Sequence, residues 1–178
     1  FMASPCMLES GWMMRLFSLK RVVLSLMTLL ALGACDAPLQ QAPPSRFVLL
    51  DGSIKTMADY KGQVLLVNFW ATSCVTCVAE MPQIVATHNK FKARGYETLA
   101  VAMQYDPPAY VARFAESRQL PFGVAIDNTG EIAKRFGDIR LTPTTFLIDK
   151  QGRIVKRYLG APDFAALEGL IGELLVKG

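Results

Sequence analysis

Histidine and paired cysteines are scarce in this sequence of 178 residues. The chain has one histidine, His88, and four cysteines, of which only Cys74 and Cys77 lie in the body of the sequence. A structural zinc site usually takes four ligands from two such pairs, so this chain cannot form a closed zinc site alone. One disulfide across so short a loop restricts the unfolded chain little, which argues against a disulfide-stapled scaffold.

The chain also lacks a strong charge and a long apolar run. Its net charge is +4, but residues 1–34 hold three of the 19 basic side chains and one of the 15 acidic ones, so the remainder is nearly neutral. This mild excess does not favour nucleic-acid binding. The apolar run at residues 22–32 is well short of the roughly 20 residues that a spanning helix needs.

Residues 1–34 are predicted to be a signal peptide. Basic residues precede the apolar run, and Gly33 and Ala34 stand directly before Cys35. The sequence Leu-Gly-Ala-Cys at 32–35 resembles the bacterial lipobox, which implies that Cys35 becomes a lipidated first residue. An uncleaved anchor over 16–32 is the alternative, but its two internal basic residues would each cost about 2.5 to 3.5 kcal/mol at a helix centre. Residues 1–12 are interpreted as upstream sequence.

These features predict a protein on the periplasmic side of a bacterial membrane, held there by lipid. Residues 35–45 are rich in proline and glutamine and are expected to form an extended spacer. The folded domain is then predicted to cover residues 46–178.

Strand and helix patterns alternate through that domain. They predict a hairpin at 47–50 and 54–57, strands at 63–70, 96–103 and 123–126, helices at 77–94, 108–118 and 128–136, a second hairpin at 144–148 and 153–158, and a helix at 163–176. The order favours an α/β fold with helices on both faces of a central sheet. His88, on the long helix, is expected at the surface.

The Cys74-Val75-Thr76-Cys77 segment joins an apolar strand to a helix. A helix N-terminus presents unpaired N–H groups and a positive dipole end, which lower a cysteine pKa. Cys74 is therefore predicted to be the nucleophile, and Cys77, one turn inward, to resolve the mixed disulfide.

Two long motifs resemble the TlpA- and ResA-like thioredoxin-fold proteins. They are K-G-Q-V-L-L-V-N-F-W-A-x-x-C-x-x-C-x-x-E-x-P at residues 61–82 and L-T-P-T-T-F-L-I-D at 141–149. The resemblance implies a thioredoxin-like fold with a central mixed sheet flanked by helices. It also implies an N-terminal β-hairpin and an inserted helix-strand unit within residues 107–126.

The resemblance also assigns roles to residues around the cysteine pair. Pro143 matches a cis-proline, and the backbone of Thr142 is then free to pair with an extended substrate. Glu80 matches an active-site glutamate that shuttles a proton to or from the buried thiol, and Trp70 is expected to shield the site and contact substrate. Asn68 departs from the buried aspartate of thioredoxins and cannot exchange protons, which shifts that task toward Glu80. No metal and no cofactor beyond the redox-active disulfide is implied.

Three functions are compatible with the sequence. The first is a protein-disulfide reductase for exported proteins, for example in cytochrome c maturation, with a membrane-embedded thiol reductant as electron donor. The second is a copper-binding thiol protein that uses Cys74 and Cys77 as soft ligands. The third, a thiol peroxidase, is disfavoured because Val67 and Ala71 stand where the peroxiredoxin pattern needs proline and serine or threonine. The direction of electron flow stays open.

Overall fold

The computed structural model describes residues 39–177. The predicted signal peptide at 1–34 and the predicted lipidation site Cys35 lie outside these residues. Leu39–Gly178 forms one compact unit with its own apolar cores. Within the described part of the chain, no helix has the length and apolar character needed to cross a membrane.

A five-stranded mixed sheet forms the centre of the fold, as the sequence predicts. Its strand order is β5-β4-β3-β6-β7, with β3 in the middle. The bounds are β3 Val64–Trp70, β4 Tyr96–Ala102, β5 Gly123–Ile126, β6 Thr144–Ile148 and β7 Ile154–Leu159. Strands β4 and β5 run parallel to β3, and β6 runs antiparallel. Every residue of β3 is buried, because both faces of the sheet are covered.

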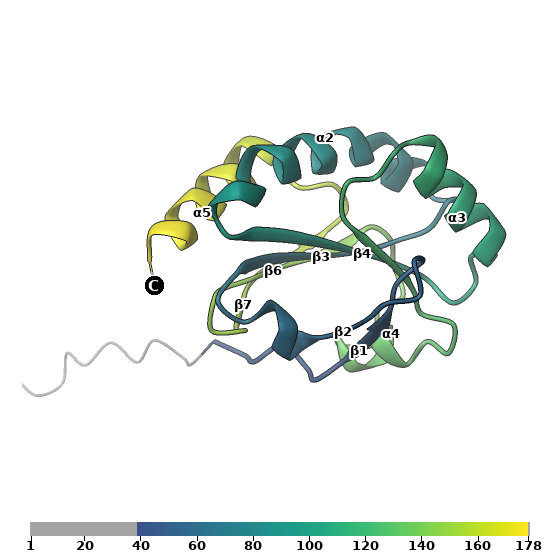
Figure 1. The fold of residues 1–178 in the computed structure, drawn as a ribbon, viewed down its shortest axis with the longest axis horizontal. Coiled ribbons are helices and arrows are strands. Elements are labelled where there is room, and N and C mark those ends of the chain that lie inside the picture. Colours follow the sequence, from purple (N-terminus) through teal and green to yellow (C-terminus); the bar gives the residue numbers. More distant parts are fainter. Residues whose placement is uncertain (1–38, 178) are drawn as a thin grey trace, which may run out of the picture. The chain divides into compact units, whose positions relative to one another are not determined.

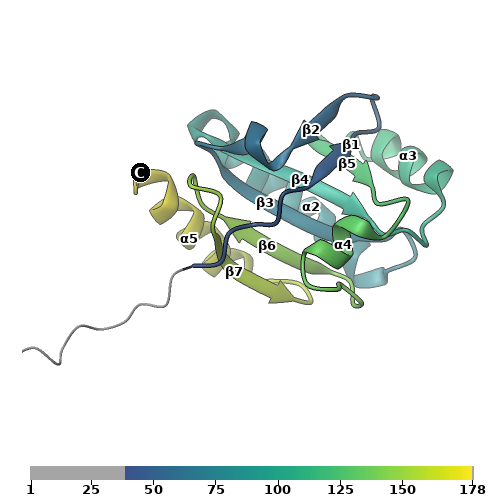
Figure 2. The same cartoon turned by 90° about the horizontal axis from the view of Figure 1, so that it is seen from below.

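Two layers of different construction cover the sheet (Figure 1). Helices α2 Val75–Phe91, α3 Pro108–Ser117 and α5 Phe164–Val176 lie on one face. The short helix α4 Glu131–Arg135 and the hairpin of β1 Arg46–Val48 and β2 Ile54–Thr56 lie on the other, as Figure 2 shows from below. Alternate β3 residues supply the two cores: Leu65, Val67 and Phe69 pack on the hairpin side, and Val64, Leu66 and Trp70 on the α2 side.

Local sequence explains where the two longest helices begin and end. Cys74 is the N-cap of α2, and a short 3₁₀ turn, Lys92–Arg94, continues from the helix to Gly95. Gly95 has a φ of 90°, a left-handed conformation that favours glycine. Asp163 caps α5, since its carboxylate accepts hydrogen bonds from Ala165 N and Ala166 N. The predicted inserted unit is present as α3 and β5.

Residues 40–45 of the expected extended spacer are attached to the domain, so these residues do not form a spacer. Ile154 N donates to the carbonyl of Gln40, and Ala42 N donates to the carbonyl of Gly152. Ala42 packs on the apolar core, and Ser45 is buried. Composition predicted a segment with nothing to bury, but its backbone pairs with the turn before β7. We call residues 40–45 the N-terminal strap.

Two further expectations differ from the structure. Helix α4 is shorter than the predicted 128–136, because Asp127 to Gly130 form a turn that Asp127 ties to the backbone of Ile132 and Ala133. His88 is buried with 3% exposure, not at the surface, and its Nδ1 lies 3.3 Å from Thr98 Oγ1. Burial lowers the pKa of His88, so the uncharged ring suits its place between α2 and β4.

Candidate redox site

The cysteine pair forms a disulfide at the N-terminus of α2, directly after the central strand β3. The two Cα atoms are 5.2 Å apart. Cys77 is fully buried, whereas Cys74 is partly exposed, so an outside reagent can reach only the Cys74 sulfur. Cys77 N donates a hydrogen bond of 3.2 Å to Cys74 Sγ. This bond and the helix dipole both favour a thiolate at Cys74 after reduction, which agrees with its predicted role as nucleophile.

A proline loop lies against the exposed sulfur. The Thr142–Pro143 peptide bond is cis, as the resemblance implied, and Pro143 leads directly into β6. Cys74 Sγ lies 3.6 Å from the carbonyl oxygen of Thr142. The hydroxyl of Tyr105 lies 3.3 Å from Thr142 Oγ1, which brings the loop after β4 to the same place.

Asp106 fixes the segment that precedes the disulfide, a role that sequence reasoning missed. Its buried carboxylate accepts hydrogen bonds from Thr72 N at 2.6 Å and from Thr72 Oγ1 at 2.5 Å. Both residues follow the carboxyl ends of neighbouring parallel strands, which meet at one edge of a sheet. The position of Thr72 and Asp106 after two predicted neighbouring strands was the sequence signal that could have indicated this contact.

Glu80 is buried on α2, three residues after Cys77 and on the same face of the helix. Burial raises the pKa of Glu80 to about 7, although the hydrogen bond from Asn68 Nδ2 to Glu80 Oε1, at 3.0 Å, partly offsets this effect. A carboxyl group with a pKa near neutrality can both accept and donate a proton at ordinary pH. The predicted proton shuttle therefore has the required burial and position.

Trp70, predicted to shield the site and contact substrate, is buried in the folded protein. Its side chain is fully buried and packs on Phe114, with ring centroids 5.0 Å apart. It lies in the same buried apolar cluster as Cys77, which agrees with the predicted shielding. The last residue of a strand covered on both faces points into a core, and that is why Trp70 offers no surface to a partner.

The segments that meet at Cys74 expose apolar side chains and no charge. Val75 is 83% exposed, and Tyr105 and Leu141 are also largely exposed. Residues 70–79, 103–105 and 141–144 contain no charged residue, and the exposed Arg140, which directly precedes the last segment, is ion-paired with Asp138. A partner would therefore be recognised here by apolar contact and backbone hydrogen bonds more than by charge.

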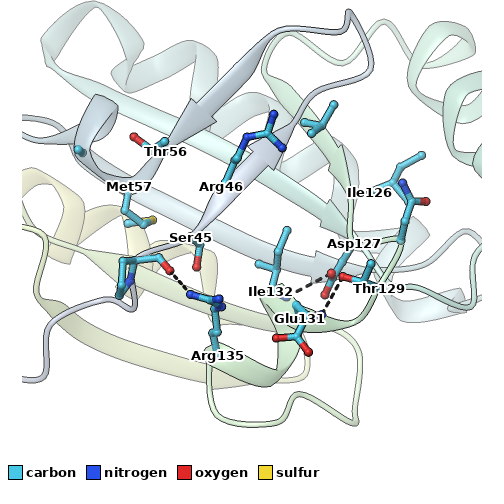
Figure 3. Close-up of a pocket in the computed structure, with 14 residues that line it drawn as sticks. Ser45, Arg46, Thr56, Met57, Ile126, Asp127, Thr129, Glu131, Ile132 and Arg135 are labelled. Carbon is cyan, nitrogen blue, oxygen red and sulfur yellow. Dashed lines mark hydrogen bonds between the residues drawn. The ribbon is translucent and has the colours of Figure 1, made fainter.

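A separate hollow of about 600 Å³ lies between α4, the hairpin and the N-terminal strap (Figure 3). Arg135 extends along it and donates to the carbonyl of Pro44. Among the described residues, none of the predicted site residues lines this hollow. Among residues 39–177, no group of three or more His, Cys, Asp or Glu side chains is placed to hold a metal ion.

The fold and the disulfide together define a thioredoxin-like protein with a CxxC site at a strand-to-helix junction. Residues 38–171 match the Redoxin family, and the chain belongs to that family. The expected resemblance is confirmed.

Named relatives agree with this assignment. The thiol-disulfide oxidoreductase ResA of Bacillus thuringiensis subsp. konkukian is 37% identical over 95 residues, which are 53% of this chain and 54% of that protein. The chain thus spans about half the length of the curated relatives it matches.

Two solved structures match a larger share of the chain. A putative thioredoxin from Neisseria meningitidis is 37% identical, with a TM-score of 0.73 over 78% of this chain and 93% of the other. A putative thiol:disulfide interchange protein DsbE from Chlorobium tepidum is 30% identical, with a TM-score of 0.69 over 77% and 96% of the two chains.

Proposed function

We propose that this protein is a thiol-disulfide oxidoreductase that reduces disulfides in exported proteins. The observation that carries the proposal is the Cys74–Cys77 disulfide at the start of α2, with one sulfur accessible and the other buried beside Glu80. The printed names of the ResA and DsbE relatives describe the same chemistry in those proteins. A role in cytochrome c maturation is one example of such a reductase task.

The reaction would proceed in two exchanges. In the reduced protein, the Cys74 thiolate attacks one sulfur of the substrate disulfide, which forms a mixed disulfide and releases the first substrate thiolate. Cys77 then attacks Cys74 Sγ, which releases the second substrate thiolate and restores the Cys74–Cys77 bond. Two electrons pass to the substrate, and Glu80 accepts the proton that the Cys77 thiol must lose.

The substrate segment would lie along the proline loop in an extended conformation. The Thr142 backbone lies beside Cys74 Sγ and would pair with the backbone of the substrate segment. The exposed Val75, Tyr105 and Leu141 side chains would contact residues on either side of the substrate cysteine.

We also propose that the protein is lipid-anchored through Cys35 and works on the periplasmic side of a bacterial membrane. The lipobox-like sequence at 32–35 supports this location. An oxidising compartment creates the need for a dedicated reductant, and a membrane-embedded thiol reductant would return electrons to the Cys74–Cys77 pair.

The reduction potential of the Cys74–Cys77 couple tests the direction of electron flow. The compact unit from Leu39 onward would be equilibrated with defined thiol buffers and its free thiols counted. A value near that of thioredoxin, about −270 mV, would support a reductant, and a value near about −120 mV would make the protein a disulfide donor. If no intramolecular disulfide forms, the proposal fails and the copper-binding alternative takes its place.

A further inference from the structure

A polar group of three side chains interrupts the apolar layer under α2. Asn68 is fully buried in the middle of β3, and Thr145 lies opposite it on β6 in the antiparallel register. Asn68 is on the same face of β3 as Leu66 and Trp70, which belong to the core beneath the helix. Glu80 enters this layer from α2. Polar groups buried at this depth cost free energy unless their hydrogen bonds are made.

Asn68 uses both of its N–H groups within this cluster. Asn68 Nδ2 donates to Glu80 Oε1 at 3.0 Å and to Thr145 Oγ1 at 2.9 Å. Asn68 Oδ1 and Glu80 Oε2 have no partner among the described residues. The Asn68 amide therefore points its Nδ2 group toward the Glu80 carboxyl group and its Oδ1 atom away from it.

The orientation of this amide is linked to the charge of Glu80. An N–H aimed at a carboxylate stabilises the ionised form, whereas a rotated amide would aim its oxygen at the same place and favour the protonated form. Thr145 Oγ1 accepts the second N–H, so both amide N–H groups are paired in the observed orientation. A hydroxyl is needed for this, because an aliphatic side chain would leave that N–H unpaired in the core.

We propose that Thr145 is a positioning residue for the redox reaction: through the Asn68 amide it holds the donor that faces Glu80, and so sets the pH at which Glu80 gains and loses its proton. The importance of Thr145 for catalysis rests on the proposed function, but its effect on the pKa of Glu80 does not. Sequence alone gave no hint of it, because residues 68 and 145 meet only through the β3–β6 register.

Few other charged groups act on Glu80. The shift in its pKa arises from burial and from the Asn68 hydrogen bond. Cys77, on the same helix, is held in the disulfide and does not titrate in the oxidised protein. On the elements packed nearby, Glu168 of α5 is paired with Lys90, and Tyr158 of β7 has a pKa that burial raises further above neutrality.

The test is a titration of the Glu80 side-chain carboxyl carbon by ¹³C NMR in the oxidised unit from Leu39 onward. In Thr145→Val we expect the midpoint to rise by about half a unit or more, and in Asn68→Leu by about one unit or more, because a hydrogen bond to the charged form is weakened or lost. Thr145→Ser keeps the hydroxyl and should titrate like the parent protein. Thr98→Val is the matched control, since Thr98 is equally buried but contacts His88 and Tyr96.

An unchanged midpoint in Thr145→Val, or an equal rise in Thr98→Val, would overturn the proposal. Because the oxidised protein is titrated without substrate, this outcome does not depend on whether the protein is a reductase. As a second readout, the rate of disulfide reduction by Thr145→Val should show its pH profile shifted upward by the same amount, with recovery in Thr145→Ser.

Discussion

The carboxyl group of Glu80 is buried, and the amount by which it lowers the stability of the folded protein depends on pH. The pKa of Glu80 is raised from its ordinary value near 4.5 to about 7, chiefly by burial. Between these values the folded protein binds more protons than the unfolded chain does, so stability falls as the pH rises through this window and is level above it. The group proposed to transfer the proton thus lowers the stability of the folded protein in neutral solution.

Glu80→Gln removes this pH dependence, because an amide does not ionise. Relative to Glu80→Gln, we expect the free energy of unfolding of the parent protein to fall by about 3 kcal/mol between pH 4 and pH 8, from the size of the pKa shift. Urea denaturation of both oxidised proteins across this range measures the difference. Glu116→Gln, at an exposed position of α3, is the control: it keeps Glu80 and should show the same fall as the parent protein. Parallel stability curves for the parent and Glu80→Gln would contradict the assignment.

Val75 adjoins Cys74, the proposed nucleophile, and is almost fully exposed, so its replacement tests how a charge at this surface affects the thiol. In Val75→Asp, a negative charge next to Cys74 would raise the pKa of that thiol. We expect alkylation of the reduced protein by iodoacetamide at pH 6 to slow about three- to tenfold. Val176→Asp makes the same change at a similarly exposed position at the end of α5 and should leave the rate unchanged. Equal rates in all three proteins would show that Cys74 is not the thiolate being measured.

The N-terminal strap is the element whose role differs most from expectation. It adds backbone hydrogen bonds at the turn before β7 and one at Met57 N, and Arg135 donates to the carbonyl of Pro44. Each such bond contributes about 1 kcal/mol net, and burial of Ala42 adds to that. The folded unit therefore begins at Leu39 and not at the first strand.

A fragment that begins at Arg46 should be less stable than one that begins at Leu39, by on the order of 2 kcal/mol, because the strap contacts outweigh the entropy cost of ordering residues 40–45. Chemical denaturation of the two fragments gives the difference. Gln40→Ser in the longer fragment keeps the backbone bond to Ile154 N and is expected to behave like its parent. Equal stability of the two fragments would mean that the strap contributes nothing in solution.

The elements predicted from periodicity are found because local pattern and burial agree in them. The run at β3 is apolar throughout since both faces are covered, and Gly95 ends the α2 region through a conformation that other residues avoid. The parts that were missed depend on distant pairing: the strap on the turn before β7, Asp106 on Thr72, and Thr145 on Asn68. No local pattern contains these contacts.

In the whole molecule, some parts of the site were predicted from the residues themselves and others only from the family resemblance. The strand-to-helix setting of Cys74 and Cys77 indicates redox chemistry from the residues themselves. The cis bond before Pro143 and the role of Glu80 came only from the family resemblance, since an X-Pro bond is cis in only about 5 to 6% of cases in folded proteins. The burial of Trp70 followed from the packing of the whole sheet, which the sequence could not specify.

The proposed lipid anchor depends on Cys35. When the full chain is produced in bacteria with radiolabelled palmitate, we expect label in the parent protein and none in Cys35→Ala, with the parent in the membrane fraction. Cys6→Ala, which changes the other N-terminal cysteine, should keep the label. Label that persists in Cys35→Ala would contradict lipidation at this residue.

The N-terminal strap lies at the end of the folded unit opposite the disulfide. Gln40 and Ala42 bind the turn that follows β6, and β6 starts beside the disulfide and runs away from it. A fluorescent protein or an affinity resin attached ahead of Leu39 would therefore leave Cys74 uncovered. Immobilised in this way, a Cys77→Ser variant would hold its partners as stable mixed disulfides on a column, ready for elution with a reductant and identification by mass spectrometry.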